Sequence, residues 1–127
     1  MPSRRPEDLH QPVSLTPAMF HILLALAAGE MHGYAIMREI AILSDGQMNV
    51  GPGTLYGSIK KMLAAGLIQE SDQRPDPDLD DERRRYYRVT ELGRRVVMAE
   101  AERLSRLVRE ARIRRLLGPA TGVQRAT

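Results

Sequence analysis

Two adjacent lysines, Lys60 and Lys61, are the clearest candidates for binding chemistry in the sequence. They fall in a segment, from Pro52 to about Ala65, whose apolar residues recur at helical spacing. The stripe predicted to be buried consists of Leu55, Ile59, Met62 and Leu63. The opposite side holds both lysines together with Gly53 and Gly57, although an interior glycine costs a helix about 1 kcal/mol relative to alanine.

This side of the helix suits a phosphate-bearing partner. Small residues let another molecule approach the backbone closely, and lysines and the N–H groups at a helix start both bind phosphate. Such a helix can lie in the major groove of DNA with its first turn near the base edges. Two alternatives stay open: Gly53 and Gly57 could allow close packing within the chain, and Lys60 and Lys61 could form a solvated helix end.

Metal binding and catalysis find little support in the residues. The histidines His10, His21 and His32 are spaced eleven apart, which is no ligand motif. The acids between 72 and 81 lack the glycine and the terminal glutamate of a calcium loop. The absence of cysteine excludes disulfides, thiolate zinc sites and cysteine nucleophiles. We therefore predict no enzyme activity, no metal and no cofactor.

Arginine dominates the charge of this 127-residue chain. Seventeen of its nineteen basic residues are Arg, and residues 83–127 carry thirteen basic and four acidic side chains. Arg offers paired donors to phosphates and base edges, which favours nucleic acid as a partner, although an Arg-rich helix can also be simply solvated. The sequence has no apolar run long enough for a membrane span and no signal-peptide pattern at its start. These features, with the absence of cysteine, predict a cytoplasmic protein of one domain.

Three helices, a hairpin and a long last helix must position these residues. Thr16 followed by proline predicts a helix start, and we expect helices over 17–28 and 33–43 before the lysine-bearing one. Their predicted inner stripes are Phe20, Leu23, Leu24 and Ala27 in the first and Ile36, Ile40 and Leu43 in the second. Gly66 is expected to cap the third helix in a left-handed conformation. The segments "LIQESD" and "RRRYYRV" predict two strands around an acidic turn.

The last predicted helix carries an apolar seam with a 3.5-residue repeat. The seam consists of Val97, Ala101, Leu104, Val108 and Ala111, and arginines lie on the other side. Two heptads are too few for an independent coiled coil, so the seam needs help, which Phe20 and Leu23 of the first helix in both subunits of a homodimer could supply. The alternative is that this helix packs on its own domain.

The fold class predicted from this order is mainly α with a two-stranded hairpin, arranged as a winged helix-turn-helix plus a long C-terminal dimerisation helix. The predicted parts are a flexible N-terminal arm, the DNA-binding domain, the dimerisation helix and a flexible tail, at 1–14, 15–90, 91–117 and 118–127.

Four motifs make the sequence similar to a known family. In order, they are "LTPAMFHILLAL", "MHGYAIMREI", "GPGTLYGSIKKMLAAGLI" and "RRRYYRVTELGRR", and they span about Leu15 to Arg95. Together they resemble the PadR family of bacterial transcriptional regulators. The resemblance implies a homodimer that binds a pseudo-palindromic operator in double-stranded DNA and usually represses. It also implies that a small aromatic or drug-like effector releases the DNA in many members.

The chain departs from the family pattern at three places. Gly51 stands where a capping serine is common, Gly57 stands where proline or another residue is frequent, and the hairpin tip is acidic rather than basic. Because phosphates would repel an acidic tip, we assign the contacts of the wing to Arg83, Arg84 and Arg85, or to Arg74. Of the three consecutive arginines, some would pair with the tip acids. A second interpretation of the chain is a ligand-sensing or protein-interaction module of winged-helix fold with weak DNA binding.

The site residues follow from the helix face and the resemblance together. Tyr34 is either a hydroxyl at the edge of the core or a phosphate contact, and at most one of Tyr86 and Tyr87 lies in the core. The effector site of the multidrug-binding branch corresponds to the region of Leu104, but without any Trp no effector can be named. The residues expected to contact DNA are Tyr34, Pro52, Gly53, Thr54, Tyr56, Gly57, Lys60, Lys61, Arg83, Arg84 and Arg85.

Overall fold

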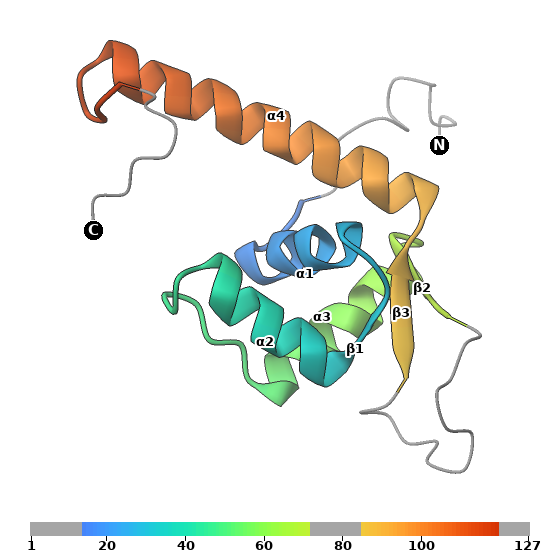
Figure 1. Cartoon of the computed structure of the whole chain (residues 1–127). Helices are drawn as coiled ribbons and strands as arrows, with labels where there is room; N and C mark the ends of the chain where they lie inside the picture. The colour runs from blue at the N-terminus through green and yellow to red at the C-terminus, as the bar shows by residue number, and fades with distance from the viewer. Residues whose placement is uncertain (1–13, 72–84, 120–127) are drawn as a thin grey trace, which may run out of the picture.

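Five helical or hairpin elements were expected, and a computed structural model shows all of them with one added strand (Figure 1). The structure describes residues 14–71 and 85–119. The predicted N-terminal arm, nearly all of the acidic turn and most of the predicted tail lie outside these ranges. The elements are α1 (Pro17–Ala27), β1 (Met31–His32), α2 (Gly33–Leu43), α3 (Pro52–Ala64), β2 (Ile68–Glu70), β3 (Tyr86–Val89) and α4 (Glu91–Ile113).

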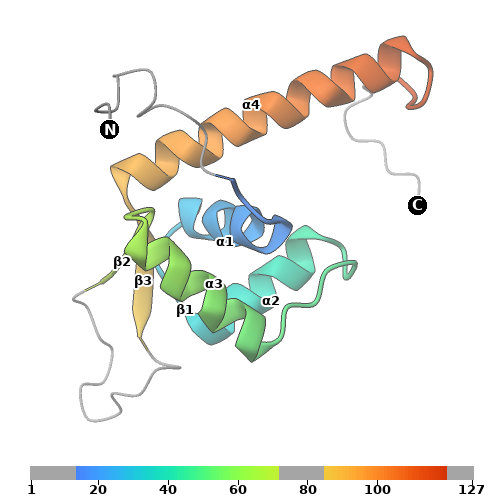
Figure 2. The same cartoon turned by 180° about the vertical axis from the view of Figure 1, so that it is seen from behind.

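Helix α1 forms the centre of the fold. In Figures 1 and 2 it lies between α4 on one side and the α2–α3 pair on the other, and it packs against all three. Its first turn is capped by Thr16, whose hydroxyl accepts a hydrogen bond from the Met19 amide at 3.1 Å. The core contains Ile22, Leu23 and Leu26 of α1, Ile36 and Ile40 of α2, and Leu55, Ile59 and Met62 of α3.

The predicted inner stripes were wrong at several positions. In α1 the buried residues are Met19, Ile22, Leu23, Ala25 and Leu26, whereas Leu24 is 39% exposed. The reason is that α1 is covered on two sides, so it buries a wider surface than a single stripe. Leu43 and Leu63 are also exposed, because each lies at the last turn of its helix, near the edge of the core.

The predicted hairpin is confirmed and gains a third strand. Strands β2 and β3 pair antiparallel, with Ile68 opposite Val89 and Glu70 opposite Tyr87. The two-residue strand β1 pairs with the other edge of β3, so that the sheet order is β1-β3-β2. Tyr87 is buried and Tyr86 is not, as their alternation along β3 predicts.

Three helices end in the same left-handed turn. Gly66 has φ 76°, and the amides of Gly66 and Leu67 donate to the carbonyls of Leu63 and Met62, which confirms the predicted cap. Helix α2 ends at Leu43 in the same way, with Asp45 as the left-handed residue at φ 56°. Helix α4 ends at Ile113, four residues before the predicted end, because Arg115 takes φ 64° and the helix cannot continue through it.

Candidate nucleic-acid interface

Helix α3 presents one buried and one exposed side. Leu55, Ile59 and Met62 pack into the core as predicted. In Figure 2 the start of α3 lies on the far side of the domain from α4 and its end approaches the start of α4, while the side of α3 opposite the core is exposed. The predicted site residues exposed on α3 are Pro52, Gly53, Thr54, Gly57, Lys60 and Lys61.

Gly53 and Gly57 serve no packing purpose among the described residues. A Cβ placed on either would have no described atom within 4 Å. The alternative in which these glycines allow close packing within the chain therefore fails for the part of the chain that the structure describes. Lys60 and Lys61, one turn further along the same helix, are exposed and form no ion pair with any residue in 14–71 or 85–119.

The start of α3 lacks a side-chain cap. Gly51 is the N-cap residue, with an extended backbone and no side-chain hydrogen bond to the first turn. Pro52 follows as the first helical residue and has no N–H. The amides of Gly53 and Thr54 are thus left without a side-chain acceptor at the positive end of the helix dipole, an arrangement that favours an anion.

Tyr56 was wrongly predicted to contact DNA. Its hydroxyl oxygen is buried, and its ring lies over Gly33 at the start of α2. A Cβ on Gly33 would come within 2.2 Å of the Tyr56 hydroxyl oxygen and 2.8 Å of Cζ. Tyr56 therefore occupies the space that the missing side chain of Gly33 leaves, and it holds α3 against α2.

The start of α2 bears on the two interpretations of Tyr34. That side chain is 57% exposed, which disfavours a hydroxyl at the edge of the core, while a phosphate contact stays a prediction. The neighbouring His32 is the N-cap of α2, since its Nδ1 accepts a hydrogen bond from the Ala35 amide at 3.1 Å. The His32 ring also packs edge to face against the Tyr86 ring, with 5.3 Å between the two ring centroids. The sequence analysis missed this cap because histidine is not among the usual capping residues.

The basic residues of the wing are partly engaged within the sheet. Arg85 forms an ion pair with Glu70 of β2 at 3.4 Å, so its partner is a strand acid within the described hairpin. Arg88 forms a similar pair with Glu30 at 3.5 Å. Arg83 and Arg84, also predicted to contact DNA, lie outside the described residues.

The predicted seam of α4 divides into two parts. Val97 is 6% exposed and packs in the core together with Leu23, which is 0% exposed. These two residues were wrongly predicted to contact a second subunit, because the first half of α4 covers α1 of its own chain. Phe20 packs against the same core but is only partly buried. The alternative of packing on the same domain is thus correct for the first half of the helix.

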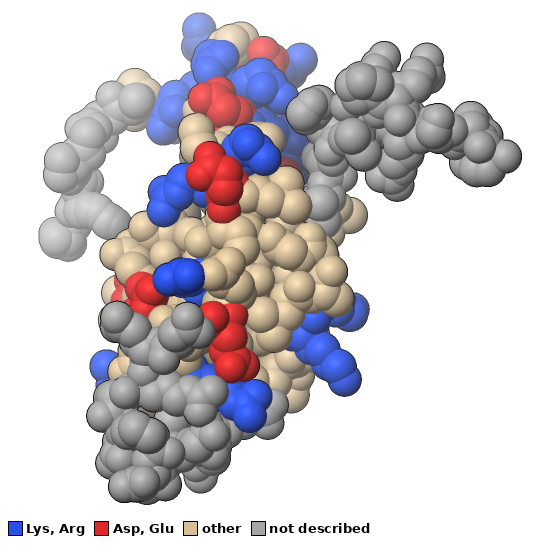
Figure 3. All heavy atoms as spheres, turned by 90° about the vertical axis from the view of Figure 1, so that its right-hand side faces the viewer, with Lys and Arg blue, Asp and Glu red and all other residues tan. Residues whose placement is uncertain are grey.

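The second half of α4 extends past the other helices (Figure 1). Its apolar side continues with Leu107, 53% exposed, and Val108, 39% exposed. Leu104 and Ala111 are partly buried, and Ala101 is exposed. Charged side chains of both signs lie along this helix at the top of Figure 3.

The ion pair between Glu100 and Arg103 on α4 shifts the pKa of the glutamate. The Arg103 guanidinium donates to both carboxylate oxygens of Glu100, at 2.9 and 2.6 Å. These hydrogen bonds hold the pKa of Glu100 below its ordinary value.

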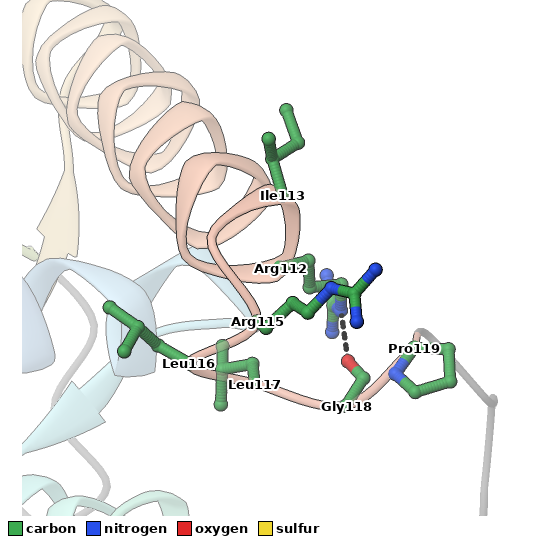
Figure 4. Close-up of a pocket in the computed structure, with 7 residues that line it drawn as sticks. All are labelled: Arg112, Ile113, Arg115, Leu116, Leu117, Gly118 and Pro119. Carbon is green, nitrogen blue, oxygen red and sulfur yellow. Dashed lines mark hydrogen bonds between the residues drawn. The ribbon is translucent and has the colours of Figure 1, made fainter.

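A shallow pocket of about 600 Å³ lies at the end of α4 (Figure 4). Its wall includes a turn that the Arg112 side chain closes by donating from Nε to the Gly118 carbonyl at 2.9 Å. Leu104, the expected effector position, is not among its lining residues. These are Arg112, Ile113, Arg115, Leu116, Leu117, Gly118 and Pro119.

The described residues offer no sign of two other kinds of site. No group of three or more metal-ligating side chains comes together within 14–71 and 85–119. In the same ranges, no helix has the length and apolar character that crossing a membrane requires.

Comparison with known proteins agrees with the geometry. Residues 22–99 match the model of the transcriptional regulator PadR-like family. The chain is 38% identical over 90 residues to the transcriptional regulator Rv3488 of Mycobacterium tuberculosis, an alignment that covers 71% of this chain and 78% of that protein. The chain is also 33% identical over 90 residues to an uncharacterized 37.1 kDa protein in transposon TN4556 of Streptomyces fradiae. That alignment covers 71% of this chain but only 24% of the transposon protein.

The solved structures show the same fold. A PadR family transcription regulator from Clostridium difficile superposes with a TM-score of 0.62 at 18% identity, covering 76% of this chain and 96% of that one. The small helical domain with a winged hairpin is therefore the architecture of this group of regulators.

Proposed function

The chain belongs to the PadR-like family of transcriptional regulators, and from that premise we propose that it binds double-stranded DNA as a homodimer with α3 of each subunit in the major groove. The wing would contact the adjacent backbone through Arg83, Arg84 and Arg85. The family is one of regulators and not of enzymes, and we propose no catalytic site, no cofactor and a cytoplasmic location.

The observation that carries this proposal is the exposed face of α3. The interior glycine Gly57 costs the helix about 1 kcal/mol, and no contact with a described residue offsets that cost. A partner that approaches the backbone closely would offset it. The exposed Lys60 and Lys61 and the uncapped first turn favour an anionic partner, and the major groove of DNA accommodates an α-helix.

The apolar side of the second half of α4 supports the homodimer. Leu107 and Val108 are exposed beyond the domain, and Leu104 and Ala111 lie on the same side of the helix. A second copy that packs on this side would place two α3 helices about one DNA turn apart, roughly 34 Å, over a pseudo-palindromic operator. Ala101 lies close to this contact, and the partly buried Phe20 of α1 would extend it.

The resemblance to the PadR family supports two further parts of the proposal. The first is that the chain represses transcription. The second is that a small molecule bound near Leu104 releases the DNA, because a ligand between the subunits can change how the two DNA-binding domains are placed.

The groove placement is tested by replacing Lys60 and Lys61 together with alanine. Each lost phosphate contact should reduce the magnitude of the slope of log affinity against log salt by about one. Because the dimer carries both lysines twice, we expect weaker binding and a slope magnitude reduced by about four, measured by fluorescence anisotropy over a range of salt.

The control replaces Arg106 and Arg109 with alanine, which removes the same charge from the outward side of α4. This control should keep the wild-type slope. Equal affinities and equal slopes for the lysine variant and the wild type would contradict the proposal.

A second candidate function is a ligand-sensing or protein-interaction module with weak DNA binding. The engagement of Arg85 by Glu70 favours it, because this ion pair reduces the phosphate contacts available to the wing. A gel shift at moderate salt with the DNA upstream of the chain's own gene separates the two. A retarded DNA band supports the DNA-binding regulator. The absence of a retarded band at micromolar protein concentration supports the ligand-sensing or protein-interaction module.

A further inference from the structure

The junction between α3 and α4 is held by backbone groups. The Thr90 hydroxyl, at the start of α4, donates to the Gly66 carbonyl at 2.6 Å and accepts from the Gly93 amide at 3.0 Å. The Thr90 amide donates to the Leu67 carbonyl at 3.0 Å. Thr90 therefore does more than cap its own helix, since two of these bonds reach the turn that ends α3.

Steric contact reinforces this junction. A Cβ on Gly93 would lie 2.0 Å from the Leu67 carbonyl oxygen and 2.9 Å from the Leu67 carbonyl carbon. Because both are backbone atoms, no side-chain rotation could relieve the overlap. The first turn of α4 thus rests directly on Leu67, in the turn that follows α3.

The same two residues close the end of α3. The amides of Gly66 and Leu67 donate to the carbonyls of Leu63 and Met62, at 3.1 and 2.9 Å. A continuous series of hydrogen bonds therefore runs from the last turn of α3 through Gly66 and Leu67 to Thr90 and α4. Two other routes join these helices, one through the apolar side chains of α1, which adjust more easily than backbone, and one through the sheet, where β2 contacts α3 and β3 contacts α4.

We propose that Thr90 is a positioning residue that fixes the direction of α3 relative to α4 and so determines the spacing of the DNA half-sites that the dimer accepts. The inference rests on the proposed function, in which α3 enters the groove and α4 carries the subunit contact. Under that function, a looser junction leaves each α3 intact while the angle between the two α3 helices becomes less defined. The expected loss is in the choice of spacing and not in the affinity for one half-site.

The decisive variant is Thr90→Asp. An aspartate can still accept the Gly93 amide and cap α4, but a carboxylate cannot donate to the Gly66 carbonyl. Thr90→Ser retains both roles of the hydroxyl. Thr16→Asp is the matched control. The Thr16 hydroxyl caps α1 by accepting a hydrogen bond from the Met19 amide, and the substitution introduces the same negative charge.

The measurement uses double-stranded oligonucleotides that the wild-type protein selects from a random library. Two copies of the selected half-site are then separated by spacers of different length, and the affinity for each is compared with that for one half-site. We expect Thr90→Asp to reduce the preference for the best spacer over its neighbours by about fivefold, the effect of one hydrogen bond, with half-site affinity within about twofold. Thr90→Ser and Thr16→Asp should keep the wild-type preference.

Amide hydrogen exchange without DNA gives a second readout. The Leu67 amide should exchange faster in Thr90→Asp, while the Gly93 amide keeps its protection because its acceptor remains. An unchanged spacer preference, or unchanged exchange at Leu67, would overturn the inference and leave the proposed function intact. If the wild type selects no DNA, the proposed function fails and the inference fails with it.

Discussion

At the residue scale, glycine has opposite uses in α2 and α3. Gly33 has no side chain because the Tyr56 side chain occupies the space, with its hydroxyl oxygen 2.2 Å from the position of a Cβ. Gly57 has no side chain although nothing in the described structure lies within 4 Å of that position. The first glycine is thus explained by packing, and the second requires a reason outside the described residues. This contrast is the strongest support for a partner at α3.

Gly33→Ala should destabilise the fold by about 1–3 kcal/mol, because the added methyl overlaps the partly buried Tyr56 side chain, whose hydroxyl end is buried. Gly57→Ala, the same change in open space, should stabilise α3 by about 1 kcal/mol. Urea unfolding followed by circular dichroism measures both. If the two variants unfold at the same midpoint, the account of Gly33 is wrong.

At the element scale, helix ends decide where the elements begin and how they are joined. Thr16 and Thr90 cap α1 and α4, His32 caps α2, and α3 begins at Gly51 with no side-chain cap. The element proposed to meet DNA is thus the one whose first amides are left without a side-chain acceptor. A phosphate group could take the place of the missing cap.

His32→Ala should cost about 1 kcal/mol of stability, the typical worth of an N-cap hydrogen bond. His32→Asn retains a capping acceptor but loses the ring contact with Tyr86, as alanine also does. The difference between the two variants therefore isolates the cap. Thermal unfolding at a pH above 7.5 is the measurement, and equal melting temperatures would mean that the Nδ1 hydrogen bond contributes little.

At the scale of the whole molecule, the two halves of α4 use one face of the helix differently. Its first half covers α1, with Val97 buried in the domain core. Its second half extends the same side beyond the domain, where Leu107 and Val108 are exposed. A helix that continues its apolar side past its own domain is suited to a second copy of the chain.

Leu107→Arg should convert the dimer to a monomer, because it places a charge on the continued apolar side. Met98 lies nine residues earlier, about two and a half turns away and so on the opposite side of α4. Since Met98 is also exposed, Met98→Arg is the matched control and should leave the dimer intact. Sedimentation velocity measures both, and a dimeric Leu107→Arg protein would refute the contact.

Much of this protein was determined by the sequence alone, because the signals are local. Helical spacing, Thr16 with its proline, the Gly66 cap and the alternating strands around an acidic turn predict the elements to within a few residues. Lys60, Lys61 and the exposed glycines were identified as one face of a helix for the same reason.

Only the tertiary structure decided which residues from distant segments meet. The Tyr56 hydroxyl points inward because Gly33 leaves room for it. Leu23 and Val97 lie in one core because α4 folds back over α1. Strand β1 joins the sheet because the chain before α2 passes beside β3. Spacing along a helix cannot distinguish these outcomes, since it shows which side a residue is on but not what covers that side. The same limit applies to Thr90, whose capping role is local but whose bond to Gly66 exists only in the folded chain.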